Sequence, residues 1–295
     1  MPRCDIIDTF PAFLTFWTEH QQERIALQIE AWAAQYMAQW PELLDKQLED
    51  YASQNVDWRQ IAQEKVFPFL AGRLPAMRVA HGNLLESCEP IYFVAQAVLG
   101  FESDVTFVIY VGIGCGAGWV TSFHDSPAVL FGLENIAECG WSQPCSITGL
   151  IAHEIGHLVH EHWRARCGKA TGFGSWWDLY TEGFAQRCEH VVLGRDTWHE
   201  STGINDDDWL NWCQEHKGWL AAEFLRVVDA GESVRPFFGS WFDLCGRRQC
   251  GYFLGHEVIE KLEAGLSLKE IALLDDVEER CRHILEKIAV EGKGS

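Results

Sequence analysis

The sequence has no long apolar run and no clear export signal. Its longest charge-free stretch, 105–123, contains four glycines and is marginal in length for a membrane span. The segment from Met1 to Phe16 mixes acidic and basic residues with apolar ones, and it lacks the basic start, apolar centre and small-residue cleavage site of a signal peptide. We therefore expect no transmembrane helix and a cytoplasmic location.

Positive charge is also scarce. The chain has 23 Lys and Arg against 43 Asp and Glu, so its formal net charge is −20. Nucleic acid and anionic membranes would be repelled, which argues against both as partners. The 11 cysteines are odd in number and form no C-x-x-C pair, so we expect reduced thiols that pack as small apolar groups.

The composition is that of a soluble globular protein, because 47% of the residues are apolar and 22% are charged. Its 14 Trp and 17 Phe predict a large, aromatic core. The 295 residues are enough for one large domain or for two modest domains that share a cleft. The oligomeric state is not predictable from these features.

The most informative motif is H-E-x-x-H, which spans His153 to His157 within an apolar-periodic run. Residues i and i+4 of a helix lie on one face, so both imidazoles can reach one metal ion. Glu154 lies about 100° around the helix from His153, beside the metal position. A carboxylate there can accept a proton from the water that the metal activates. The pattern predicts a zinc site.

A catalytic zinc site usually has three protein ligands. The metzincin pattern requires His at 163 and Gly at 160, and the chain has Trp163 and His160 instead. His160 shares the face of His153 but lies about 10 Å further along the helix axis, too far to bind the same ion. We expect His160 to support the site or to pack between helices.

Glu182 is the best third ligand, because it lies in the next helical stretch, 176–186, between small residues. Gly183 and Ala185 would allow this helix to approach the metal helix closely. Asp178 and Glu189, one and two turns away, are alternative ligands. Asp178 could instead orient the ligands by hydrogen bonding, as could Gln186 on the same face.

These residues resemble the gluzincins, the thermolysin-like zinc peptidases, which combine H-E-x-x-H with a later Glu in an E-G-x-A setting. Within that group, Thr181 to Ala185 is similar to a family of uncharacterised domains described as predicted zinc-dependent proteases. Gly251 to Gly255, followed by Gly265 to Leu268, is similar to it too. The resemblance covers about residues 90–275.

The resemblance implies that His153, His157 and Glu182 bind zinc and that Glu154 is the general base. It also implies that a peptide substrate lies along the strand at 127–133. Thermolysin-like enzymes carry an Asp one turn after the ligand Glu, where this chain has Gln186.

The negative charge of the tetrahedral intermediate requires a hydrogen-bond donor besides the metal. Tyr252 is our candidate, because it follows Gly251 and begins a predicted helix. A tyrosine that simply packs its ring at a helix start is an equally good interpretation. His256 and Arg247 are lower-ranked donors.

A glycine-rich segment, 112–118, matches G-x-G-x-x-A after a strand, with Glu134 about twenty residues later. A dinucleotide site also requires a helix to begin at the glycines. The residues that follow, 119–123, are typical of a strand. We therefore expect the glycines to allow a bend or a close approach of another segment.

We predict an α+β fold: a small mixed or antiparallel sheet with the H-E-x-x-H helix packed on it, in a thermolysin-like arrangement. A helical N-terminal region would span 1–85 and the metallopeptidase domain 86–295. That domain would contain strands within 91–133, metal helices within 146–190 and C-terminal helices within 206–290. Since no long connection joins the strands, the sheet should be largely antiparallel or mixed.

Three functions are compatible with these residues. The first is a zinc-dependent peptidase that acts on a peptide or protein. The second is a zinc hydrolase of a non-peptide amide, and the third is a non-catalytic protein that keeps the metal for structure or partner binding. Glu154 disfavours the third, because a structural zinc site uses Cys and His ligands and needs no base.

Overall fold

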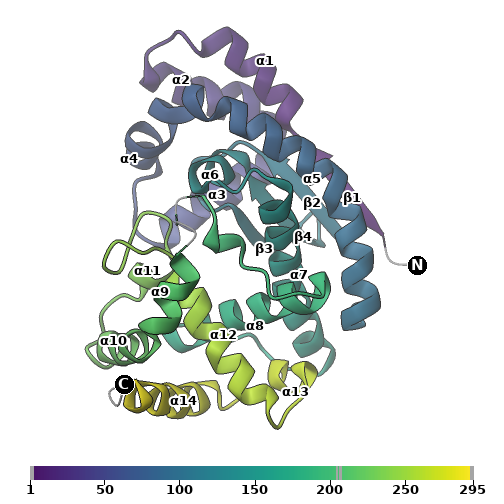
Figure 1. Ribbon diagram of the computed structural model, residues 1–295. Coiled ribbons are helices and arrows are strands. Elements are labelled where there is room, and N and C mark those ends of the chain that lie inside the picture. The colour runs from purple at the N-terminus through teal and green to yellow at the C-terminus, as the bar shows by residue number, and fades with distance from the viewer. Residues whose placement is uncertain (1–2, 204, 206–207, 293–295) are drawn as a thin grey trace. The chain divides into compact units, whose positions relative to one another are not determined.

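The computed structural model describes residues 3–203, 205 and 208–292, and it divides the chain into two compact units (Figure 1). One unit contains residues 1–92 and 102–151, and the other contains 93–101 and 152–295. The chain is α+β and mostly helical, with a small mixed sheet, so the predicted fold class is right at this level. Within the described ranges, no helix is both long and apolar enough to cross a membrane.

The first unit contains a four-stranded sheet in the order β1-β2-β4-β3. Its strands are β1 (Cys4–Asp8), β2 (Val105–Tyr110), β3 (Gly118–Phe123) and β4 (Ser126–Gly132). β1 and β4 both run parallel to β2, whereas β3 runs antiparallel to β4. β2, β3 and β4 lie within or next to the region 91–133 predicted to hold strands, β4 matches the strand predicted at 127–133, and the sheet is mixed.

Strand β3 lies at the sheet edge because of two backbone features. The glycine-rich segment leads the chain from the end of β2 past β4 to this edge. His124 and Asp125 then form a two-residue turn with φ values of 48° and 60°. Such left-handed turns match the twist of a hairpin, so β3 and β4 pair directly.

Besides parts of α5 (Leu70–Leu99) and α7 (Pro144–Arg166), the first unit contains a series of short helices. They are α1 (Phe10–His20), α2 (Ile25–Ala31), η1 (Trp32–Tyr36), η2 (Met37–Gln39), α3 (Pro41–Ser53), α4 (Trp58–Ile61), η3 (Ala62–Val66), η4 (Phe67–Phe69) and α6 (Leu133–Cys139). Trp32 is fully buried, and its Nε1 donates to the carbonyl of Val111, 3.0 Å away, just beyond β2. α3 begins at Pro41, whose fixed φ suits the first turn of a helix.

The N-terminal region is not only helical. β1 pairs with β2, so residues before 85 share a sheet with strands that we assigned to the metallopeptidase domain. The expectation of no long connection between strands is wrong for this pair, because a series of helices separates them. The two units therefore differ from the predicted boundary between residues 85 and 86.

A single helix, α5 (Leu70–Leu99), occupies the first part of the strand region predicted for 91–133. It contains Pro75 and Pro90 in its interior. Buried residues recur along it every three or four positions, at Met77, Ala80 and Leu84 among others. This buried face stabilises the helix enough to offset the N–H groups that the prolines lack.

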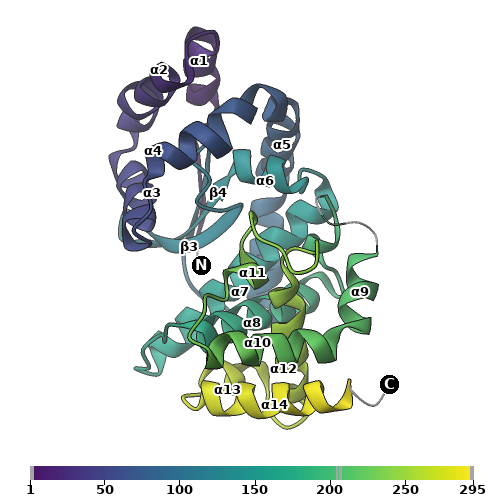
Figure 2. The ribbon, with the colours of Figure 1, turned by 90° about the vertical axis from the view of Figure 1, so that its left-hand side faces the viewer.

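The second unit is helical. It contains the part of α7 (Pro144–Arg166) from residue 152 onward, and then α8 (Ser175–Leu193), η5 (His199–Ser201), α9 (Trp209–Glu215), α10 (Lys217–Asp229), α11 (Arg235–Phe238), α12 (Cys250–Glu263), α13 (Leu268–Ala272) and α14 (Val277–Glu291). Figure 2 shows α10 alongside α14, which it contacts extensively. The predicted C-terminal helices are present, although residues 206 and 207 lie outside the described part.

Two close helix contacts organise the candidate site. A Cβ atom added to Gly183 of α8 would lie 2.1 Å from the carbonyl carbon of Gly255 in α12. One added to Gly156 of α7 would lie 2.9 Å from the Cα of Ala185 in α8. Gly183 therefore faces α12, and our expectation that it faces the metal helix is wrong. Gly156, inside the motif, is the glycine that brings α7 and α8 together.

Candidate metal centre

Helix α7 presents both histidines of the motif on one face. The ring centroids of His153 and His157 are 5.0 Å apart, with 73° between the ring planes. Ile155 and Val159 have no exposed surface, so the opposite face of the helix is anchored in the core. This arrangement follows directly from the i, i+4 spacing.

Glu182 of α8 faces both imidazoles. Its Oε2 lies 3.1 Å from His153 Nε2 and 3.3 Å from His157 Nε2. Two ligand atoms bonded to one tetrahedral zinc ion at 2.0–2.1 Å are about 3.3 Å apart. The two nitrogens and the oxygen therefore have a spacing that fits a divalent ion between them. Two neutral nitrogens and a carboxylate oxygen are also a ligand set that zinc accepts.

The electrostatics of these side chains suit a cation. Burial lowers the pKa of His153 to about 4, so its imidazole is neutral and has a lone pair to offer. Burial alone would raise the pKa of Glu182, but the charge and hydrogen bonds of the two histidines hold it below its ordinary value. For His157, burial lowers the pKa, and the effect of Glu182 exceeds this and raises it to about 9. A metal ion would displace that proton.

Glu154 is the residue next to the first histidine, and its side chain is almost fully buried. Burial raises its pKa to about 7, with a further increase from Glu182 that is opposed by His157. A carboxyl group with this pKa can both accept and donate a proton near neutral pH. Because Glu154 follows His153 directly in α7, the helical repeat alone sets its direction around the helix axis, and its role beside the metal stays a prediction.

His199 and Glu200, which the sequence analysis missed, lie beside the histidines of the motif. The ring centroids of His199 and His153 are 5.1 Å apart. His199 Nδ1 lies 2.7 Å from Glu189 Oε2, and His199 Nε2 lies 3.5 Å from Glu200 Oε1. His199 and Glu200 belong to the short η5 turn after α8, where the sequence shows no helical or strand periodicity that would have pointed to them.

Tyr252 also lies beside this cluster. Its ring centroid is 5.5 Å from that of His153 and 6.5 Å from that of His199. Of the lower-ranked donors, His256 packs between His190 and Trp198, with ring centroids 4.6 Å and 4.9 Å away. The position of Tyr252 is compatible with its predicted role, which stays a prediction.

Arg247 lies in the segment before α12. Its backbone forms an isolated β-bridge with Leu244, and its Nη2 lies 4.0 Å from Asp208 Oδ2. Neither partner is a predicted ligand, so these contacts give Arg247 no direct link to the histidines of the motif.

The remaining predicted residues have other contacts. Gln186 Nε2 lies 3.0 Å from His190 Nε2 and donates to the Thr197 carbonyl at 2.9 Å, so it does not orient a ligand through these bonds. Asp178 is exposed at the surface of α8. Burial of part of its carboxyl group raises its pKa to about 6, with a smaller contribution from Glu182.

His160 packs between helices, which is one of its two predicted roles. Its Nε2 lies 3.3 Å from the hydroxyl of Tyr180, and its ring contacts Phe184 with centroids 5.1 Å apart. Burial lowers the pKa of His160 to about 3. It supports the contact between α7 and α8.

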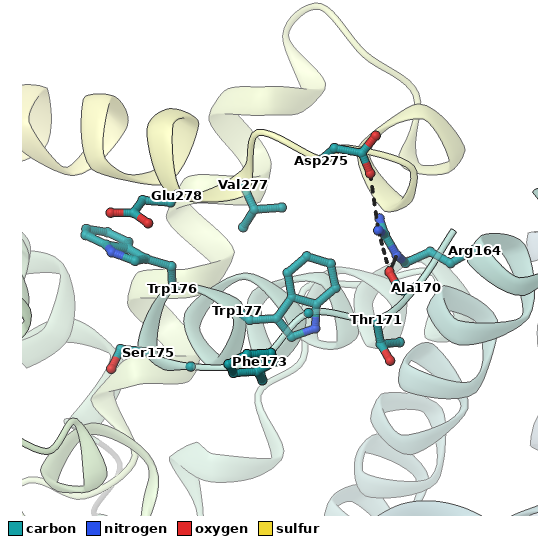
Figure 3. Close-up of a pocket in the computed structure, with 12 residues that line it drawn as sticks. Arg164, Ala170, Thr171, Phe173, Ser175, Trp176, Trp177, Asp275, Val277 and Glu278 are labelled. Carbon is teal, nitrogen blue, oxygen red and sulfur yellow. Dashed lines mark hydrogen bonds and ion pairs between the residues drawn. The ribbon is translucent and has the colours of Figure 1, made fainter. Parts of the chain in front are cut away.

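Figure 3 shows a separate pocket of about 420 Å³ between the start of α8 and the start of α14. Trp176 and Trp177 form much of its wall, together with Arg164 and Asp275. The Arg164 guanidinium donates to the carbonyls of three residues, Ala170, Ala272 and Leu274. These bonds tie the loops together, and none of the predicted metal ligands lines the pocket.

Comparisons with known proteins do not place this chain in a family. A scan against protein-family models gives no match, and searches of the curated proteins and of the solved structures give none either.

Proposed function

We propose that this protein is a zinc-dependent peptidase of the gluzincin type, with His153, His157 and Glu182 as metal ligands and Glu154 as general base. The observation that carries the proposal is the convergence of both Nε2 atoms on one Glu182 oxygen, at 3.1 and 3.3 Å. Glu154 gives the proposal its enzymatic character, because a structural zinc site has no use for a buried, proton-accepting carboxylate beside its ligands.

The zinc ion, when bound, supplies a Lewis acid that activates water and polarises the carbonyl of the substrate. Glu154 accepts the proton of the attacking water and then donates it to the leaving amine. Its pKa near 7 is compatible with both steps. The Tyr252 hydroxyl donates a hydrogen bond to the carbonyl oxygen as negative charge develops there.

The substrate class is a peptide or protein chain, with a non-peptide amide as the alternative, and nucleic acid and membranes are not partners. A cytoplasmic location also remains a prediction. The non-catalytic alternative would keep the three ligands without needing Glu154.

The central test is Glu154→Gln, assayed on a proteome-derived peptide library with the zinc-loaded protein. We expect one zinc ion per chain in both proteins and a loss of about 10²–10⁴ in peptide hydrolysis for the variant. Full activity in the variant would place the base elsewhere. No hydrolysis of any peptide by the zinc-loaded wild type would favour the amide hydrolase or the non-catalytic protein.

Tyr252→Phe tests the second catalytic residue. We expect turnover to fall about 10²–10³-fold, because one donor to the developing oxyanion is lost. Metal affinity should remain unchanged, since the hydroxyl is not a ligand. Unchanged turnover would mean that Tyr252 only packs its ring at the start of α12.

A further inference from the structure

His153, the first proposed metal ligand, has two ring nitrogens, and only Nε2 has a hydrogen-bond partner among the described residues. Its Nε2 faces Glu182, so this nitrogen is the one that would bind the metal. A neutral imidazole that binds metal through Nε2 carries its proton on Nδ1. His153 Nδ1 is buried and has no hydrogen-bond acceptor within the described residues. Metal-binding histidines almost always donate this proton to a carboxylate, a carbonyl or water.

Glu200 is a buried carboxylate in the same cluster as His153. It has no exposed surface, and neither of its oxygens accepts a hydrogen bond from the part of the chain that the structure describes. One carboxylate oxygen of Glu200 and one ring nitrogen each of His153 and His199 lie within 4.8 Å of one another. The cluster thus contains a buried His153 Nδ1 without an acceptor and a buried Glu200 carboxylate without a donor.

Glu189 is the competing acceptor, because it too is fully buried and its Oε1 has no partner in the described ranges. Its other oxygen, however, is 2.7 Å from His199 Nδ1. That contact pairs one Glu189 oxygen with His199, whereas neither oxygen of Glu200 has a hydrogen-bond partner among the described residues. Glu200 faces the opposite ring nitrogen, Nε2, at 3.5 Å.

We propose that Glu200 is a positioning residue that accepts the Nδ1 proton of His153 and so holds this imidazole in place for the metal. The inference rests on the proposed metal site. The proposal connects four side chains in series, Glu189–His199–Glu200–His153, and so links the η5 turn to the metal. A carboxylate that accepts the Nδ1 proton makes the His153 imidazole a stronger ligand.

The test is the zinc affinity of the full chain, measured by competition with a chelator, for Glu200→Gln and Glu200→Leu. Gln keeps a neutral acceptor and Leu removes it. We expect zinc affinity to fall in the order Glu, Gln, Leu, by about 10–100-fold for Leu. The absorption bands of the cobalt-loaded protein should shift in the same order. Metal-free stability serves as the control for a merely structural role, which would change it without changing metal affinity.

Glu134→Gln, which changes a buried carboxylate of the other unit, is the control and should bind zinc as the wild type does, and Glu189→Leu tests the competing acceptor. An unchanged affinity in Glu200→Leu with a tenfold loss in Glu189→Leu would overturn the proposal in favour of Glu189. Two zinc ions in the wild type and one in Glu200→Leu would make Glu200 the ligand of a second ion. If Glu200→Leu does not fold, Glu200→Gln decides, and wild-type zinc affinity there would reject the proposal. A wild type that binds no zinc would reject the proposed function itself.

Discussion

Buried carboxylates in the two units differ in how their oxygens are paired. In the first unit, Glu134 accepts hydrogen bonds from the backbone N–H of Gly112 at 2.8 Å and of Gly114 at 3.0 Å. In the second unit, Glu200 accepts none from the described residues, and Glu189 uses only one oxygen. All three carboxylates have no exposed surface.

The difference separates a structural role from a functional one. The Glu134 carboxylate is explained by the fold, because it holds the glycine-rich segment between β2 and β3. Unpaired polar groups in the interior are costly and rare, and they are expected where a ligand, an ion or a reaction uses them. Among the described residues of the second unit, the unpaired atoms include His153 Nδ1 and both oxygens of Glu200, which belong to one cluster with the predicted metal ligand His153.

The largest expected effect is that of Glu182→Ala on metal binding. Removal of a ligand oxygen should weaken zinc affinity by more than the loss of an orienting partner, so by at least about 100-fold. Chelator competition measures this directly. Glu134→Gln is the control from the other unit and should bind zinc as the wild type does. Equal affinities for Glu182→Ala and the wild type would show that these residues do not form the metal site.

A smaller effect is expected for Glu134→Ala on folding. The change leaves two backbone N–H groups near the sheet without their acceptor, which should lower the free energy of unfolding by about 2–4 kcal/mol. Denaturant unfolding of the metal-free protein gives this value. A loss below 0.5 kcal/mol would mean that water replaces the carboxylate and that Glu134 is less structural than the comparison assumes.

The same carboxylate should make stability depend on pH. Burial raises the pKa of Glu134 to about 7 in the folded protein, partly offset by the N–H groups of Gly112 and Gly114. Between pH 4.5 and 7 the folded state therefore holds a proton that the unfolded state has lost. The stabilisation is complete below the unfolded pKa and is lost as the pH rises through 7.

Unfolding of the wild type and Glu134→Gln at pH 5 and pH 8 isolates this contribution, since other titrating groups are common to both. The wild type should lose up to about 1.4 kcal/mol per pH unit relative to the variant in this range. Parallel pH profiles would place the Glu134 pKa near its ordinary value.

The sequence predicts the metal residues better than it predicts their surroundings. His153, Glu154 and His157 follow from one helical repeat, so their relative positions need only the local geometry of α7. Glu182 was found because α8 follows α7 after a short loop. His199 and Glu200 come together with His153 only through the tertiary fold, and no spacing in the sequence indicates this.

Parts of the fold were mispredicted for a similar reason. The glycine-rich segment was expected to bend the chain, which it does, but its partner Glu134 was visible only as a possible ribose ligand. Gly140, with φ of 75°, ends α6. Pro75 and Pro90 indicated breaks that burial of one face of α5 overcomes. Predictions from neighbouring residues were right where no contact with residues distant in the sequence favoured another structure.

The smallest effect concerns the packing that holds the second unit's site together. In Gly156→Ala, the new Cβ would lie 2.8 Å from the Cβ of Cys188 and 2.9 Å from the Cα of Ala185. Since α7 and α8 must then separate, we expect about 1–2 kcal/mol of lost stability, as in other overpacked cores. Zinc affinity should fall as well, because His157 and Glu182 would move apart. Gly265→Ala, with no atom within 4 Å of its new Cβ, is the control and should change neither quantity. If Gly156→Ala lowers stability but leaves zinc affinity intact, the ligands tolerate helix movement. The metal rather than the packing would then set their spacing.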